Sequence, residues 1–150
     1  MNYSSLLQDI QARLVTNDAI VKVYREQFVP PEADKTRGYL AFDFTVTDIQ
    51  KCNLAHTGII EGDLDIISYC TNDVRRSVVT TSAMDLWIPR VGTKRVQIAP
   101  TVLGTSFLHF IYLESMLELH QEKTGHPIPE TIGTLMTFHL KASIVETGVE

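Results

Sequence analysis

The stretch GIIEGDLDIISYC, residues 58–70, decides how the rest of the chain is interpreted. Its acidic residues Glu61, Asp63 and Asp65 alternate with apolar ones, and this period of two is typical of a half-buried β-strand. A strand places such side chains on one face at intervals of about 7 Å. The apolar side chains of this stretch are therefore expected to face a core on the other side.

A helix is predicted directly after this strand. Asn72-Asp73 supplies a cap, and Pro89 ends the helix near Ile88, because proline disfavours helical geometry in the residue before it. The expected apolar face recurs at helical spacing: Val78, Val79, Ala83, Leu86 and Trp87. Trp87, the only tryptophan, is predicted to lie in the core rather than to act as a stacking platform.

Two elements are predicted at the N-terminal end. A helix runs from Ser5 to Val15, and Ser5 with Gln8 has the spacing of a capping box. Residues 19–25 then form a strand rich in β-branched and aromatic side chains. Residues 30–37 begin with two prolines, which remove donors from a sheet ladder, so this segment is expected to be an exposed loop.

The next strand, predicted over residues 39–47, alternates strictly and is expected to pair with residues 58–70 as an antiparallel hairpin. The polar residues 48–57 would form the long loop of this hairpin. The side chains predicted to point inward share one face: Leu40, Phe42, Phe44 and Val46.

The C-terminal third contains the most ambiguous segment. Residues 106–120 fit both a helical and an alternating pattern, and the alternation favours a strand. Residues 122–129 hold a glycine and two prolines and are expected to form a turn or projecting loop. Residues 134–144 are predicted to form an alternating strand in which His139 points outward. The residues expected to point toward the core are Met136, Phe138, Leu140, Ala142 and Ile144.

These elements predict one α+β domain over residues 1–150, with a mainly antiparallel sheet and both helices packed on one face. The length, with 44% hydrophobic and 21% charged residues, is that of an ordinary globular domain. The net charge of -5 argues against specific nucleic-acid binding. No stretch resembles a membrane span or a signal peptide, so a cytoplasmic origin without membrane partners is expected.

The common catalytic and nucleotide-binding motifs are absent from the sequence, including G-x-x-x-x-G-K-[ST], G-x-S-x-G and H-E-x-x-H. We therefore expect no enzyme, no catalytic residues, no cofactor and no metal site. Cys52 with His56 and His120 with His126 are the most suggestive metal pairs, but neither has the paired spacing of structural zinc. Cys52 and Cys70 are expected to be free thiols, given a reducing compartment.

A candidate interface remains. The row Glu61, Asp63 and Asp65 is either a solvated strand face or a surface that meets basic side chains of a neighbouring copy. The basic residues considered for that contact bracket the second helix: Arg75, Arg76, Lys94 and Arg95. Two of these cations begin the helix, where the helix dipole disfavours positive charge. Such a local conflict often marks a functional surface, but a solvated face is the simpler explanation and is favoured here.

The block from Gly58 to Trp87, together with the helix, strand and final-strand order around it, resembles the tail-terminator (tail-completion) and neck proteins of long-tailed bacteriophages. The resemblance covers most of the chain and rests on pattern, without a diagnostic motif. The stretch from Val91 to Pro129 departs from it, because the long β-hairpin extension that it could form exceeds the family pattern.

The resemblance implies a structural virion protein rather than an enzyme. Members of this family form a ring, here expected to be a homohexamer, that caps the tail tube, stops its polymerisation and provides the surface for head-tail joining. It implies a tail-tube protein and a head-completion or connector protein as partners. It also implies a location in the tail or neck of the virion after assembly in the host cytoplasm.

A second class of function stays open at this point. The face formed by Glu61, Asp63 and Asp65, or the histidines, could serve a small cytoplasmic enzyme or a metal- or ligand-binding domain. Another phage neck or baseplate component is a further alternative.

Overall fold

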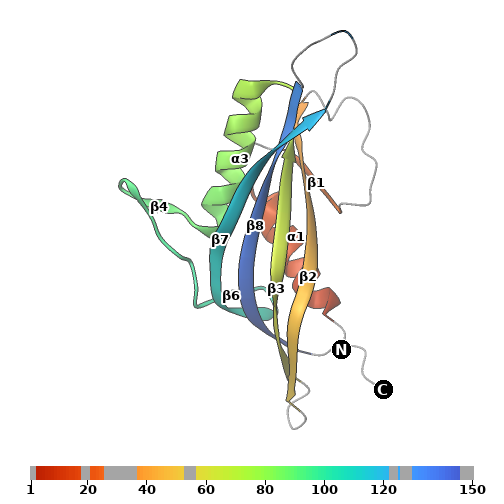
Figure 1. The fold of residues 1–150 in the computed structure, drawn as a ribbon. Coiled ribbons are helices and arrows are strands. Elements are labelled where there is room, and N and C mark those ends of the chain that lie inside the picture. The colour runs from red at the N-terminus through yellow and green to blue at the C-terminus, as the bar shows by residue number, and fades with distance from the viewer. Residues whose placement is uncertain are drawn as a thin grey trace.

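Figure 1 shows the fold in the computed structural model, which describes residues 3–17, 21–25, 37–52, 57–121, 125 and 130–145. In chain order the elements are α1 (Ser4–Val15), β1 (Lys22–Arg25), β2 (Tyr39–Cys52), β3 (Thr57–Tyr69), α3 (Asp73–Trp87), β4 (Arg90–Val91), β5 (Lys94–Arg95), β6 (Thr101–Leu103), β7 (Ser106–Gln121) and β8 (Glu130–Val145).

Six of the strands form one sheet in the order β1-β2-β3-β8-β7-β6, and β4 with β5 forms a separate small hairpin. Strand β1 is parallel to β2, whereas every other pair in the large sheet is antiparallel. The predicted α+β class with a mainly antiparallel sheet is therefore confirmed, with β1 making the sheet mixed. The ambiguous segment is strand β7, as its alternation indicated.

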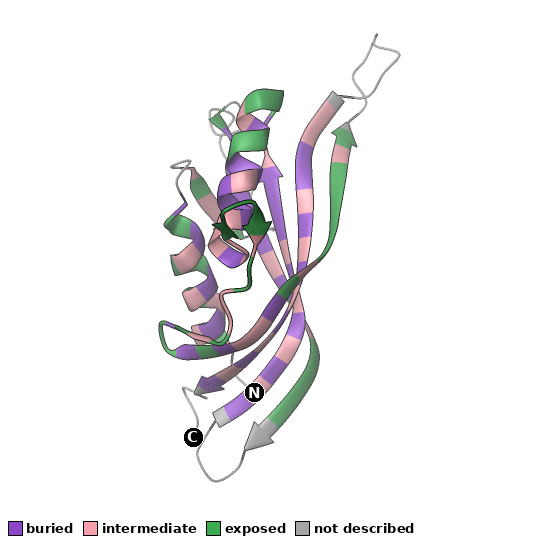
Figure 2. Ribbon diagram, turned by 90° about the vertical axis from the view of Figure 1, so that its left-hand side faces the viewer, coloured by how far each residue is buried: buried purple, intermediate pink, exposed green. Residues whose placement is uncertain are grey.

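Both helices cover the same face of the sheet, and the core lies between them and the strands (Figure 2). Helix α1 buries Leu6, Ile10 and Leu14, which recur at helical spacing, and α3 buries Trp87. From the sheet, inward-facing residues of β2, β3, β8, β7 and β6 complete this core: Leu40, Phe42, Phe44, Ile60, Leu64, Ile66, Met136, Phe138, Leu140, Ala142, Ile144, Leu108, Ile111 and Leu103. The inward-pointing residues predicted for the last strand are therefore confirmed.

Polar contacts fix the helices on this face. The Arg13 Nε of α1 donates to the Leu86 carbonyl of α3 at 2.8 Å, and Thr80 of α3 shares a hydroxyl hydrogen bond of 2.6 Å with Ser68 of β3. The Asp9 carboxylate accepts from the backbone N–H of Ser106, at 2.9 Å, in the turn between β6 and β7. Each contact joins segments that lie far apart in the chain, so the helix positions are determined by tertiary structure.

The predicted N-terminal cap of α3 is confirmed, whereas that of α1 is wrong. Asn72 caps α3, because its Oδ1 accepts from the Arg75 backbone N–H at 2.9 Å. The capping box predicted at Ser5 is wrong: α1 begins at Ser4, after Tyr3, which makes no side-chain capping hydrogen bond. Ser5 lies inside the first turn, and its hydroxyl is buried without a hydrogen-bond partner.

Two further predictions are corrected. Val78 does not belong to the apolar face of α3, because it is 47% exposed, while Val79 is fully buried. Residues 48–52 are not part of a loop: they continue β2 after a bulge near Thr47 and pair with the start of β3, so backbone pairing outweighs their polar composition. Residues 53–56 lie outside the described part.

The remaining predicted segments are covered only in part. The first strand begins at Lys22, since Val21 is described but does not belong to it, and residues 18–20 are outside the described part of the chain. The predicted loops 30–37 and 122–129 fall there as well, apart from Arg37 and Gly125. Cys70 is buried. The β2–β3 register places Cys52 at the opposite end of the hairpin from Cys70.

Candidate functional site

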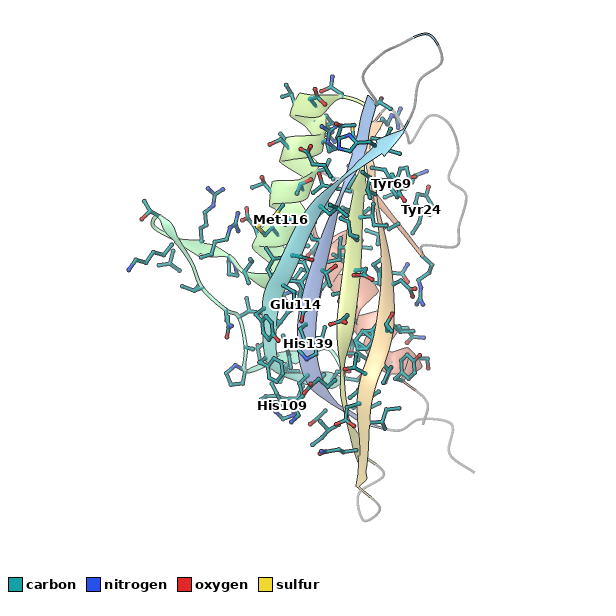
Figure 3. All side chains as sticks on the ribbon, in the orientation of Figure 1. Tyr24, Tyr69, His109, Glu114, Met116 and His139 are labelled. Carbon is teal, nitrogen blue, oxygen red and sulfur yellow. The ribbon has the colours of Figure 1, made fainter. Side chains whose placement is uncertain are left out.

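The face of the sheet opposite the helices carries the acidic row that was predicted from the sequence. We call it the outer face. Its centre lies on β3, β8 and β7, where His139 and Glu114 are seen in Figure 3. The register places Asp63 opposite His139 and His139 opposite Tyr112, so side chains of three strands meet in one transverse row.

His139 is the hub of this centre. Its Nδ1 lies 2.9 Å from Asp63 Oδ1 and 4.0 Å from Glu114 Oε1, and its Nε2 lies 3.0 Å from Glu61 Oε2. The histidine side chain is only 14% exposed, whereas its carboxylate partners are about one-third exposed. The aromatic rings of Phe110 and Tyr112 on β7 lie against the imidazole, at centroid distances of 5.9 and 5.5 Å.

These contacts favour the protonated imidazolium. The hydrogen bond with the Asp63 carboxylate is the largest influence and raises the pKa of His139, and Glu61 raises this pKa further. Partial burial opposes the shift but does not cancel it. Because both ring nitrogens face carboxylate oxygens, a protonated ring donates to both of them at once.

The acidic row predicted from the sequence does lie on one face, as expected for alternate residues of a strand. Its members are not simply solvated, because Asp65 accepts a hydrogen bond of 2.8 Å from the Thr137 hydroxyl, and the other two contact His139. The sequence predicted an outward His139 but not these contacts. Only the β3–β8 register brings together residues that are 76 and 78 positions apart.

Among the described residues, Asp63, Glu114 and His139 form a group that could hold a metal ion, because one ligand atom of each lies within 4.8 Å of the others. Carboxylate oxygens and an imidazole nitrogen suit several divalent cations. A metal bound at Nδ1 would have to displace the proton that the carboxylates favour there, so cation binding and His139 protonation would compete. Each of the two pairs that the sequence suggested, one of cysteine and histidine and one of two histidines, contains a residue outside the described part of the chain, His56 in one and His126 in the other.

The basic residues predicted for an interface occupy three different environments. Arg76 is 8% exposed, and its guanidinium donates to the Cys70 and Thr131 carbonyls at 3.1 Å and to Asp73 at 2.7 Å. These acceptors account for a cation at the beginning of α3, despite the helix dipole. Arg75, by contrast, is partly exposed, and its Nε donates to the Arg37 carbonyl at 3.0 Å.

Lys94 and Arg95 lie on the β4–β5 hairpin, which projects from the body of the molecule beside α3 (Figure 1). Lys94 is exposed. The Arg95 guanidinium binds the Asp85 carboxylate at 2.7 Å and the Ile88 carbonyl at 2.9 Å, which ties the hairpin to the end of α3. The four basic residues therefore do not form one patch within a chain, and their contact with an acidic face of another copy stays a prediction.

A third feature, which the sequence did not indicate, is the second half of β7. Met116 and Leu117 are 48% and 60% exposed, and Glu118 is exposed as well. Strand β6 pairs with β7 only through residues 106–108, so the described chain offers β7 no further strand on that side. A groove of about 410 Å³ runs between this half of β7 and α3, and its lining includes Thr80, Met84 and Met116.

Within the described residues, no helix is both long and apolar enough to cross a membrane. No protein-family model and no curated protein matches the sequence. Among solved structures, the fold is similar to that of a chain in the structure described as "Virion of native gene transfer agent (GTA) particle". The two chains are 13% identical with a TM-score of 0.50, and the match covers 92% of this chain and 91% of that one. At this level of identity, the similarity concerns the fold.

Proposed function

We propose that this protein is a structural component of a phage-like virion and acts there as a ring-forming tail terminator. The observation that carries the proposal is the similarity of fold to a chain of a gene transfer agent virion, over more than nine-tenths of both chains. Similarity over such a length concerns the whole architecture rather than a local motif. The fold alone does not determine a function, so the surface must supply further support.

The surface supports an assembly role. Val91, Val102 and Leu117 are each at least 60% exposed, and they lie on the small hairpin, on β6 and on β7. Met116, which is 48% exposed, adjoins Leu117 on β7 beside the groove with α3, and adjoining exposed apolar side chains are the kind of surface that becomes buried against other proteins. The resemblance of the block from Gly58 to Trp87 to tail-terminator proteins agrees with this role and makes it more specific.

In this role the protein assembles with itself as a ring, with six copies as the proposed number. One side of the ring binds the end of the tail-tube protein and stops its polymerisation. The other side presents a surface to a head-completion or connector protein. Head-to-tail contacts related by a rotation close into rings, whereas contacts without closure give filaments.

The proposal is tested by imaging and by tube growth. Light scattering of the purified protein is expected to give a mass near six times the 16.9 kDa of one chain, and negative-stain images are expected to show rings with a lumen. Added to a polymerising tail-tube protein, it should shorten the tubes and appear at their ends. A monomeric mass at all concentrations, also with tube protein present, would contradict the proposal.

Divalent-cation binding is a second candidate function, because Asp63, Glu114 and His139 bring their ligand atoms together on the outer face. Metal analysis of the purified protein and calorimetric titration with zinc or manganese test it. Stoichiometric binding that is lost in Asp63→Asn and kept in Asp43→Asn, a control on the same face, would favour this candidate. The absence of a heat of binding in this titration at high protein concentration would reject divalent-cation binding.

A further inference from the structure

The large sheet has two ends, and they differ in length and in charge. At one end, β1 is a strand of four residues, KVYR, whose strand neighbour in the described chain is β2. At the other end, β7 extends far beyond the three residues that pair with β6. An exposed strand edge with apolar side chains is a template for pairing with another chain, and proteins usually protect such edges.

The strand registers place these two ends at the same height in the sheet. Lys22 pairs with Tyr39, Tyr39 with Tyr69, Tyr69 with Gly133, and Gly133 with Leu119. The next three rows lead in the same way from Val23 to Glu118, from Tyr24 to Leu117, and from Arg25 to Met116. The four residues of β1 are thus level with Met116–Leu119, where β7 is most exposed.

We propose that β7 pairs through Met116–Leu119 with β1 of a second copy of this chain, so that the sheets of neighbouring copies join edge to edge around a ring. This inference rests on the proposed ring and adds the surface that builds it. It is an addition of a strand to a sheet, in which backbone hydrogen bonds supply much of the affinity and side chains supply the specificity.

The strand directions are suited to this contact. Strand β1 is parallel to β2, and the antiparallel pairs β2–β3, β3–β8 and β8–β7 leave β7 running opposite to β1. A rotation about an axis along the strands preserves these directions, so the β1 of the next copy arrives antiparallel to β7. Because the two ends are level, the same rotation needs no shift along the axis, and the contact can close into a ring.

The side chains are complementary as well. Tyr24 packs edge-on against Tyr39 on the outer face, and Leu117 lies on the same face of β7, so the contact brings an aromatic and an aliphatic side chain together. On the helix face, the Arg25 guanidinium lies 5.0 Å from the centre of the Phe42 ring. Glu118 shares that face and lies diagonally opposite, within reach of a long side chain.

Cross-linking tests the predicted register. In a Cys52→Ser background, the double variant Tyr24→Cys with Leu117→Cys is expected to form a ladder of covalent multimers on mild oxidation, because directly opposite residues bring their Cβ atoms within disulfide range. The matched control pairs Tyr24→Cys with Val102→Cys, an exposed position on β6 that the proposal does not place at the contact. It should stay monomeric on a denaturing gel.

A charge swap supplies an independent test. Arg25→Glu and Glu118→Arg are each expected to shift the protein from ring to monomer in light scattering, and the double variant is expected to restore the ring. Far-ultraviolet circular dichroism of each single variant checks that the monomer is folded. If the wild type forms rings while the ladder is missing and the single variants still assemble, the edge contact is wrong and the proposed function stands. A wild type that never assembles overturns both.

Discussion

Strands β8 and β7 are neighbours of 16 residues each, yet within the described residues only β8 is paired along both of its edges over most of its length. The outward residues of β8 are partly buried, and His139 and Thr137 bind carboxylates of β3. In the second half of β7, Met116 and Leu117 are exposed on opposite faces of the sheet. Figure 2 shows a run of exposed, green ribbon along this strand. The centre of the sheet therefore stabilises the monomer, whereas its edge is available for assembly.

The largest effect is expected from removing a core side chain of β8. Phe138→Ala should lower the free energy of unfolding by about 3–5 kcal/mol, because Phe138 is fully buried and a cavity remains. Leu117→Ala on β7 should change it by less than about 0.5 kcal/mol, since this side chain is 60% exposed. Urea unfolding of the monomer measures both values. If the two variants lose the same free energy of unfolding, β8 and the edge of β7 do not differ in their contribution to stability, and this account is wrong.

Arg76 gives the next largest effect. Arg76→Met should cost roughly 1–3 kcal/mol, because the Cys70 and Thr131 carbonyls at the ends of β3 and β8 lose their charged donor. The Asp73→Asn variant is the control, since the Asp73 side chain is 82% exposed and the carbonyl contacts remain. The same unfolding experiment compares the two variants. A loss in Asp73→Asn as large as in Arg76→Met would show that the surface ion pair, and not the carbonyls, matters.

The smallest effect concerns pH and the His139 cluster. The folded protein raises the pKa of His139 above its ordinary value of 6.5, mainly through the Asp63 carboxylate, so proton binding favours the folded state. This stabilisation is fully present below the unfolded pKa and is lost as the pH rises through the folded pKa. The difference in stability between wild type and His139→Gln should therefore shrink as the pH rises from about 6.5 through the folded pKa of His139.

The control for this measurement is His109→Gln, because the His109 ring contacts the Ser143 hydroxyl at 2.6 Å rather than the acidic cluster. Its stability difference from wild type should vary less over the same range. A difference for His139→Gln that grows with pH would contradict the assignment of the histidine as a carboxylate-bound cation.

The sequence predicted most of the sheet because burial imposes a period of two. Residues 39–47 and 134–144 alternate cleanly, and both are strands with the expected inward faces. Residues 48–52 were misassigned because the backbone pairing of β2 with β3 continues through them after the bulge, whatever the polarity of the segment. The composition of a segment does not indicate whether its backbone pairs with a neighbouring strand.

The candidate site was less accessible from the sequence. The acidic row is a local pattern and could be identified, but the contacts of Asp63 and Glu61 with His139 depend on which strand lies beside β3. Arg76 looked like a misplaced surface cation because its carbonyl acceptors are brought to it by the ends of two strands. The open edge of β7 follows from strand order, which no sequence motif encodes.

Hydrogen exchange, measured strand by strand at low and high protein concentration, tests the central claim most directly. Amides of β8 should be protected in both states, since this strand has neighbours on both sides. The alternate amides of β7 within residues 116–119 that point away from β8 should exchange quickly in the monomer and become protected on assembly. If rings form and the exchange of these β7 amides does not change, the edge of β7 is not the assembly surface.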